Sequence, residues 1–209
     1  MKLFIFDMGQ VVADNVAVES SIAQMLGMSK NDFFSCCKYD RSVRGKSNIV
    51  DIHSADILTM LSDGHITTAD FWKEVYVRTG KRIDADYMHI FFNPVLNGDV
   101  VKIIKTLREK KYRVVCGTNT VESHYRVHLE RGDYALFDKI YASNVLGVSK
   151  PDVVFWQRIL LGEHTEAEHV FFVDDNEENC LAAKSLGIYT HQFVNAEILQ
   201  KEIDVFLQK

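Results

Sequence analysis

Two adjacent acids close the apolar run Val170-Phe171-Phe172-Val173-Asp174-Asp175, and the run Leu3-Phe4-Ile5-Phe6-Asp7 ends in a carboxylate in the same way. Apolar runs of this length predict buried strands, and in an open parallel sheet ligands bind outside the carboxyl ends of the strands. Three carboxylates gathered there would repel one another unless a cation lay between them, and hard oxygen ligands favour Mg²⁺. We therefore expect Asp7, Asp174 and Asp175 to form a magnesium site.

A hydroxyl and a lysine follow two other expected strands. Thr118 and Asn119 come directly after the apolar run 112–117. Lys150 follows the run 139–143. The hydroxyl of Thr118 and the backbone N–H groups at the start of the next helix can hold phosphoryl oxygens, and Lys150 can supply positive charge to the transition state. An acid, a hydroxyl, a lysine and an acid pair in this order predict phosphoryl transfer through an aspartate.

Short apolar runs alternate with helix-like stretches along the chain. The runs are β-branched or aromatic and cover residues 2–6, 112–117, 139–143, 170–173 and 188–193. Between them, apolar residues recur every three or four positions, which is typical of helices. This alternation predicts an α/β fold with a Rossmann-like parallel sheet and helices on both faces.

The interval between the first two expected strands has no comparable run and instead predicts helices. Residues 29–32 and 67–70 each form a capping-box pattern, and Pro94 stands where this block returns to the sheet. We therefore expect an all-α cap domain at residues 15–93, inserted into an α/β catalytic core of residues 1–14 and 94–209.

Four motifs in this chain follow the order of a known family. They are Phe6-Asp7-Met8-Gly9-Gln10-Val11-Val12, Gly117-Thr118-Asn119-Thr120, Ser149-Lys150-Pro151-Asp152 and Val173-Asp174-Asp175-Asn176-Glu177-Glu178-Asn179. Together they resemble the motifs of the haloacid dehalogenase superfamily, most of whose members are Mg²⁺-dependent phosphatases, and the resemblance covers the whole chain. Within the superfamily the chain resembles bacterial sugar-phosphate phosphatases of the α-D-glucose-1-phosphate type.

The resemblance implies a role for each group in these motifs. Asp7 would be the nucleophile and, with the backbone carbonyl of Gly9 and with Asp175, a ligand of Mg²⁺. Asp174 would bind the metal through water or orient Lys150. The resemblance also implies that the catalytic and phosphate-binding groups include Thr118, Asn119 and Lys150.

Three residues of the expected cap are candidates for substrate contact. Arg41 and Arg44, with Lys46, form a basic cluster that could close over an anionic substrate or form a solvated face. His53 could face the cleft, but sequence alone does not orient its side chain. We expect Arg41, Arg44 and His53 to reach the substrate.

Gly9 departs from the pattern of the superfamily. Most phosphatases of this type carry a second aspartate two residues after the nucleophile, which protonates the leaving oxygen and then activates water. Such general acid–base help is worth on the order of 10² to 10⁴ in rate. Because a phosphate on an anomeric oxygen leaves more easily, the glycine favours a sugar 1-phosphate.

Asp14 is a nearby acid, and we expect it to cap the first cap helix rather than to act in catalysis.

The bulk composition favours a cytoplasmic enzyme that has no nucleic-acid or membrane partner. The formal net charge of −5 and the pI near 5.9 give no attraction to nucleic acid or to an anionic membrane. No apolar run is long enough to span a membrane, and the N-terminus has no secretory signal pattern. The four cysteines follow neither a zinc nor a disulfide spacing. The expected partner is a small phosphorylated metabolite, and monomer and homodimer both stay open.

Three functions fit these residues. The first is a Mg²⁺-dependent phosphatase of a sugar phosphate. The second is a metal-independent dehalogenase-type hydrolase, against which the unbalanced charges of Asp174 and Asp175 argue. The third is a catalytically weak or idle relative that binds a phosphorylated ligand or partner, and Gly9 supports it.

His124 and His128 have a spacing that could bind zinc, but no third ligand is near and we expect a polar helix surface there.

Overall fold

A five-stranded parallel sheet forms the centre of the protein, seen in a computed structural model that describes residues 2–40 and 51–209. Its strands are β1 (Leu3–Phe6), β4 (Arg113–Thr118), β5 (Lys139–Ala142), β6 (Val170–Asp174) and β7 (Tyr189–Gln192). The order across the sheet is β5-β4-β1-β6-β7, so the chain builds one side from β1 and then crosses to β6 on the other. The switch in strand order therefore lies beside β1, where a ligand site is expected. This Rossmann-like α/β fold is the one that the sequence predicts.

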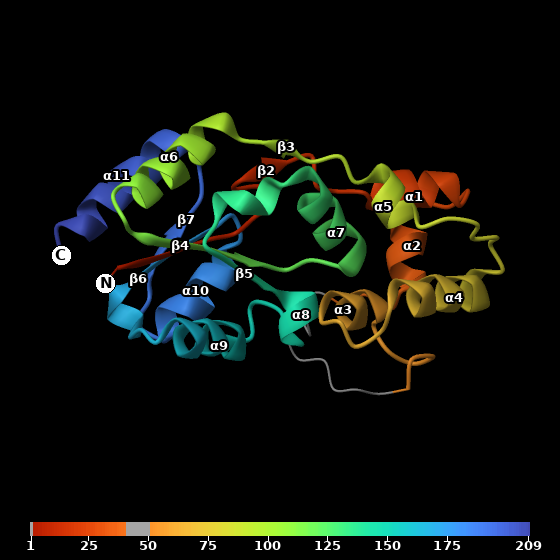
Figure 1. Ribbon diagram of the computed structural model, residues 1–209. Helices are drawn as coiled ribbons and strands as arrows, with labels where there is room; N and C mark the ends of the chain where they lie inside the picture. The colour runs from red at the N-terminus through yellow and green to blue at the C-terminus, as the bar shows by residue number, and fades with distance from the viewer. Residues whose placement is uncertain (1, 41–50) are drawn as a thin grey trace.

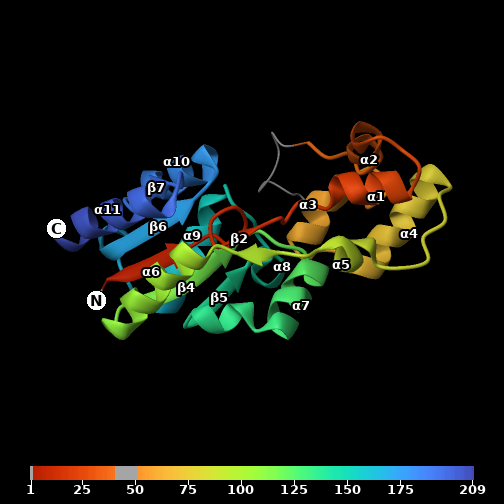
Figure 2. The same cartoon turned by 90° about the horizontal axis from the view of Figure 1, so that it is seen from above.

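Helices cover both faces of the sheet, as the two views show (Figures 1 and 2). They are α6 (Gly98–Glu109), α7 (Glu122–Arg131), α8 (Ser143–Leu146), α9 (Val153–Glu163), α10 (Glu177–Ser185) and α11 (Ala196–Leu207), with 3₁₀ turns η2 (Asp133–Leu136) and η3 (Ala167–His169). Successive strand residues point to opposite faces. Phe4 and Phe6 accordingly pack with α6 and α11, and Leu3 and Ile5 pack with α9 and α10. Among the described residues, no helix combines the length and apolar character that a membrane crossing requires.

The described residues between β2 (Ala13–Asp14) and β3 (Val95–Leu96) form helices, as the sequence predicts. These are α1 (Glu19–Met25), α2 (Lys30–Cys36), α3 (Ile57–Ser62), α4 (Thr68–Thr79) and α5 (Tyr87–Phe91). Both expected capping boxes are present, at the starts of α2 and α4. The helices form a third apolar cluster, whose fully buried members include Ile22, Phe33, Ile57, Phe71 and Val75. Val127 of α7 also belongs to this cluster, so the cluster reaches the sheet region.

β2 and β3 pair with each other where the chain leaves and re-enters the sheet region. Ala13 lies opposite Leu96, and Asp14 lies opposite Val95, in an antiparallel pair. Figure 1 shows α1 to α5 together at one end of the molecule and both chain termini at the other end. We propose that residues 15–93 are a cap domain inserted into a core of residues 1–14 and 94–209, with the β2–β3 pair at its base.

The expected capping role of Asp14 is wrong. α1 begins at Glu19, and its N-cap residue, Val18, makes no side-chain cap hydrogen bond. The chain is still extended at Asp14 because β2 pairs there with β3. A two-residue strand has no measurable periodicity, and so the sequence did not indicate this pair.

Candidate active site

The parallel register of β1 and β6 brings the predicted acids together. Phe6 lies beside Val173, and the backbone N–H of Asp7 donates to the carbonyl of Val173 at 2.9 Å. Asp7 and Asp174 are buried and Asp175 is exposed, and one carboxylate oxygen from each lies within 4.8 Å of the others. Three carboxylates at this spacing are an oxygen-rich cluster of the kind that hard divalent cations prefer.

Lys150 reaches into the same cluster from the loop that precedes α9. Its Nζ donates to Asp7 Oδ1 at 2.9 Å, to Asp174 Oδ2 at 2.6 Å and to the carbonyl of Gly117 at 2.9 Å. The side chain is 1% exposed. An ammonium group has three donors, and all three find acceptors here, which is what a buried lysine requires.

Burial sets the electrostatics of this group. It raises the pKa of Asp7 to about 7, with further increases from Asp174 and Asp175 and an opposing decrease from Lys150. Burial would lower the pKa of Lys150, but the carboxylates of Asp174 and Asp7 outweigh it, so this pKa lies above the ordinary value. One lysine therefore faces three acids. The excess negative charge of the carboxylates could be balanced by a divalent cation.

The hydrogen bonds of Asp174 fit the orienting role better than direct metal ligation. Its Oδ1 accepts from the backbone N–H of Asn176 and from Nδ2 of Asn179, both at 2.9 Å, while Oδ2 accepts from Lys150. Asp175, in contrast, lines a cavity of about 640 Å³ together with Asp7, Gly9, Asn119 and Lys150. The residues present could thus hold Mg²⁺ through Asp7, Asp175 and the carbonyl of Gly9. Asp174 would not bind the metal directly but would orient Lys150 by accepting its hydrogen bond.

The second and third motifs are locked together by a pair of amide hydrogen bonds. Asn119 Nδ2 donates to the carbonyl of Lys150, and the backbone N–H of Lys150 donates to Asn119 Oδ1, both at 2.8 Å. Thr118, at the end of β4, is 3% exposed and lies at the same edge of the sheet. The structure therefore joins Asn119 to Lys150 directly, while Thr118 lines the adjoining pocket together with Asn119.

The cap candidates are not gathered at this cluster in the described residues. His53 Nδ1 lies 2.9 Å from Glu74 Oε2, and the His53 side chain is 65% exposed. It does not belong to the described lining of the cavity beside Asp7. Arg41, Arg44 and Lys46 lie outside the described residues.

The expectation of a polar surface at His124 and His128 is wrong. His128 is 3% exposed and its Nδ1 lies 2.9 Å from Asp133 Oδ2. His124 stacks on Phe92 with ring centroids 3.8 Å apart. Both imidazoles line a pocket between α7 and the cap, because α5 packs on this side of α7.

The sequence analysis predicted no role for two supporting residues of the site, Ser143 and Gly117. The hydroxyl of Ser143, which is fully buried, accepts from the backbone N–H of Thr120 at 2.9 Å and donates to the carbonyl of Ser62 at 2.6 Å. It thereby joins the loop after β4 to the end of α3. Gly117 gives its carbonyl to Lys150, and an added Cβ there would lie 2.7 Å from Ile5 Cγ2. A glycine inside a strand was the signal for close packing at this point.

Curated relatives match parts or all of the chain. A drimenol cyclase of Aspergillus calidoustus is 29% identical over 151 residues, covering 67% of this chain and 28% of the relative. A sesquiterpene phosphatase of Aspergillus oryzae is 39% identical over 67 residues, covering 32% and 31%. A D-ribitol-5-phosphate phosphatase of Bacteroides thetaiotaomicron is 26% identical over an alignment of 225 positions, covering 99% and 98%. The chain thus spans less than a third of the first two relatives and nearly all of the third.

Solved structures share the fold. A haloacid dehalogenase-like hydrolase from Porphyromonas gingivalis has a TM-score of 0.72 and 21% identity, covering 100% of this chain and 98% of that chain. A variant of a family enzyme from Bacteroides thetaiotaomicron, solved with magnesium and inorganic phosphate, has a TM-score of 0.70 and 21% identity, covering 92% and 93%. The sequence itself matches the haloacid dehalogenase-like hydrolases over residues 1–187, and the chain therefore belongs to this family.

Proposed function

We propose that the protein is a Mg²⁺-dependent phosphatase that hydrolyses a phosphate monoester of a small metabolite through Asp7. The observation that carries this proposal is the buried contact of Lys150 with Asp7 and Asp174, beside a cluster whose carboxylate oxygens lie within 4.8 Å of one another. All three N–H donors of Lys150 are used, and an excess of negative charge stays around it. Such a cluster favours a divalent cation, which would in turn attract a phosphoryl group rather than an uncharged substrate.

The chain's own residues divide the reaction into two displacements. In the first, a carboxylate oxygen of Asp7 forms a bond to phosphorus while the bond from phosphorus to the ester oxygen breaks, and the departing alkoxide takes a proton from water. In the second, water attacks phosphorus, the bond to Asp7 breaks, and phosphate leaves. Thr118 and the N–H groups after β4 would bind the phosphoryl oxygens throughout, and Lys150 would place its positive charge beside them. Bound Mg²⁺ would neutralise charge on the phosphoryl oxygens.

The finer proposal is that the ester is a sugar phosphate, and specifically a 1-phosphate. The D-ribitol-5-phosphate phosphatase that matches over nearly the whole chain supports a polyhydroxylated substrate. Gly9 supports a 1-phosphate, because no carboxyl group stands at that position to protonate a poor leaving group.

The test is phosphate release from a panel of sugar and nucleotide monophosphates, with Mg²⁺ and with EDTA. We expect turnover that requires the metal and is lost in Asp7→Asn, with 1-phosphates ahead of 6-phosphates. Turnover that survives complete chelation would instead support a metal-independent hydrolase. Tight phosphate binding without turnover would support the idle relative.

A further inference from the structure

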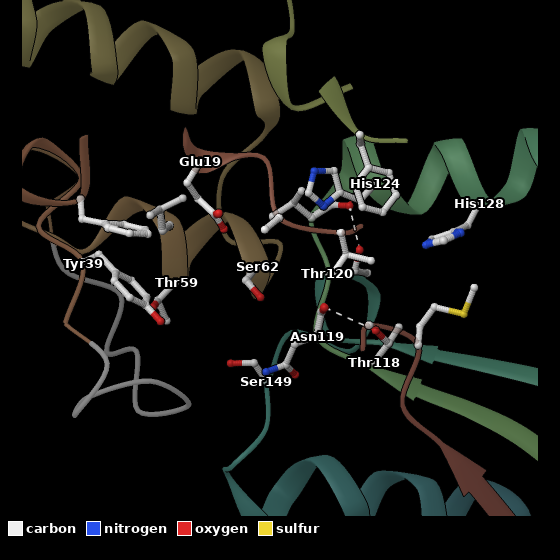
Figure 3. Close-up of a pocket in the computed structure, with 18 residues that line it drawn as sticks. Glu19, Tyr39, Thr59, Ser62, Thr118, Asn119, Thr120, His124, His128 and Ser149 are labelled. Atoms are coloured by element: carbon white, nitrogen blue, oxygen red, sulfur yellow. Dashed lines mark hydrogen bonds between the residues drawn. The ribbon is translucent and has the colours of Figure 1, made fainter. Parts of the chain in front are cut away.

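A second pocket adjoins the cavity that contains Asp7. Its volume is about 340 Å³, and it shares Gly9, Val16, Tyr39 and Asn119 with that cavity. The remaining walls come from Met8, the loop after β4, Ser149 and α7 on the core side, and from α1, α2, α3 and Phe92 on the cap side (Figure 3). Because the phosphoryl group would lie between Asp7 and Asn119, this pocket is where the organic part of the ester would extend.

Most of the described wall of this pocket is apolar, and hydroxyl groups form part of the rest. Aromatic and aliphatic side chains form the larger share, and the hydroxyls come from three segments of chain. The apolar group includes Val16, Phe34, Tyr39, Leu58, Phe92 and Val121, and the hydroxyl group includes Thr59, Ser62, Thr120 and Ser149. Apolar faces combined with a few polar groups are typical of sites for small organic molecules.

Glu19 is the one charged group among the described residues that line this pocket at pH 7. Burial lowers the pKa of His124 to about 4 and also lowers the pKa of His128, so both imidazoles are neutral there. In Figure 3 the Glu19 carboxylate is directed into the pocket, between Tyr39 on one side and His124 on the other. The described lining contains neither lysine nor arginine.

The only described ion pair of Glu19 leaves its carboxylate able to act in the pocket. Lys30 Nζ lies 3.7 Å from Glu19 Oε2, and the two side chains are 45% and 33% exposed. An ion pair this long and this exposed is weak. An ionised carboxylate can only accept hydrogen bonds, so it attracts hydroxyl groups and repels a second anion.

We propose that Glu19 selects the leaving group: it accepts a hydrogen bond from a hydroxyl of an uncharged, polyhydroxylated alcohol, and it disfavours esters that carry a second phosphate or carboxylate. The apolar wall would contact the C–H face of the same group. This inference rests on the proposed phosphatase function and deepens it, because it names a specificity residue in the cap and a chemical class for the part of the substrate beyond the phosphate.

The test compares wild type and Glu19→Gln on three esters: a hexose 1-phosphate, a hexose 1,6-bisphosphate and p-nitrophenyl phosphate, which has no hydroxyl. We expect kcat/KM for the hexose 1-phosphate to fall roughly tenfold, as for loss of a charge-assisted hydrogen bond. The value for p-nitrophenyl phosphate should stay unchanged, and the value for the bisphosphate should rise about two- to fivefold.

Two control variants separate a substrate contact from a loss of an ion pair. Lys30→Gln breaks the pair but keeps the Glu19 charge, and Glu197→Gln breaks a matched exposed pair with Lys201 on α11. Both should behave as wild type on all three esters. A Lys30→Gln variant that reproduces the effect of Glu19→Gln would overturn the proposal, as would an equal loss on all esters or no loss on the hexose 1-phosphate.

Failure of the phosphatase proposal would be visible separately. Metal-dependent release of phosphate from p-nitrophenyl phosphate tests that proposal without involving Glu19. If no phosphate is released, the contact can still be tested by calorimetry. The dissociation constant of the hexose 1-phosphate is measured for Asp7→Asn and for the double variant Asp7→Asn, Glu19→Gln. Equal dissociation constants in the two variants would reject the role of Glu19.

Discussion

At the scale of single residues, Lys150 holds the site together. Its ammonium group lies between Asp7 and Asp174 with 1% of the side chain exposed, so the two carboxylates lose their nearby cation if it is removed. We predict that Lys150→Met lowers the free energy of unfolding in EDTA by about 3–5 kcal/mol, as for a broken buried ion pair. Chemical denaturation measures this. Mg²⁺ should restore part of the loss, and Lys102→Met, which removes an exposed lysine, should cost less than about 0.5 kcal/mol. A loss below about 1 kcal/mol at Lys150 would contradict this role.

Gly9, where the superfamily usually has an acid, has room for a Cβ. A Cβ at this position would meet only Val16 Cγ2 within 4 Å, at an ordinary contact distance of 3.5 Å. We therefore predict that Gly9→Asp folds and raises kcat for esters with poor leaving groups, by up to about 10². Steady-state kinetics on an alkyl phosphate would show it. Gly9→Asn has the same shape without the proton, and an equal gain in that variant would exclude acid–base catalysis as the cause.

At the scale of elements, Ser143 connects the core to the cap. Its buried hydroxyl is shared between the N–H of Thr120 after β4 and the carbonyl of Ser62 at the end of α3. Ser143→Ala would leave both groups without this partner, and we predict a loss of about 1–3 kcal/mol in the free energy of unfolding. Ser185→Ala, at an exposed hydroxyl on α10, is the matched control and should be nearly neutral. Equal stability of the two variants would show that Ser143 does not join the parts.

The strands and the capped helices could be predicted because their signals are local. Buried strands such as β6 have an unbroken apolar run, and the boxes at Ser29 and Thr67 lie within one turn of chain. The β2–β3 pair could not, because two residues carry no period. The burial of His128 could not either, since it depends on Asp133 and on packing against α5 rather than on the pattern of α7.

The residues of the site also differ in whether the sequence could predict their positions. The acids and the lysine stand at strand ends, so parallel topology alone brings them to one edge. The reciprocal bonds between Asn119 and Lys150 join loops that are distant in sequence. The position of Glu19 in the pocket depends on how the cap helices pack against the core. Such contacts leave no mark in a single sequence.

At the scale of the whole molecule, the interface between core and cap makes stability depend on pH. Burial lowers the pKa of His124 to about 4. Below about pH 6.5 the imidazole therefore binds a proton in the unfolded chain, whereas in the folded protein it stays neutral until the pH approaches 4. Stability from this group is therefore complete above pH 6.5 and is lost as the pH falls toward 4, by about 3 kcal/mol. His124→Phe keeps a ring against Phe92 and should flatten the fall in melting temperature over this range. An unchanged pH profile would show that His124 titrates normally.

The proposed reaction requires Asp7 to carry the phosphoryl group during turnover. The most direct measurement is acid quenching of the enzyme with Mg²⁺ and excess substrate, followed by mass spectrometry of its peptides. We expect a phosphoryl group on the peptide that contains Asp7, absent after quenching in EDTA and absent in Asp7→Asn. Turnover with that peptide unmodified, or with the phosphoryl group on another residue, would contradict it.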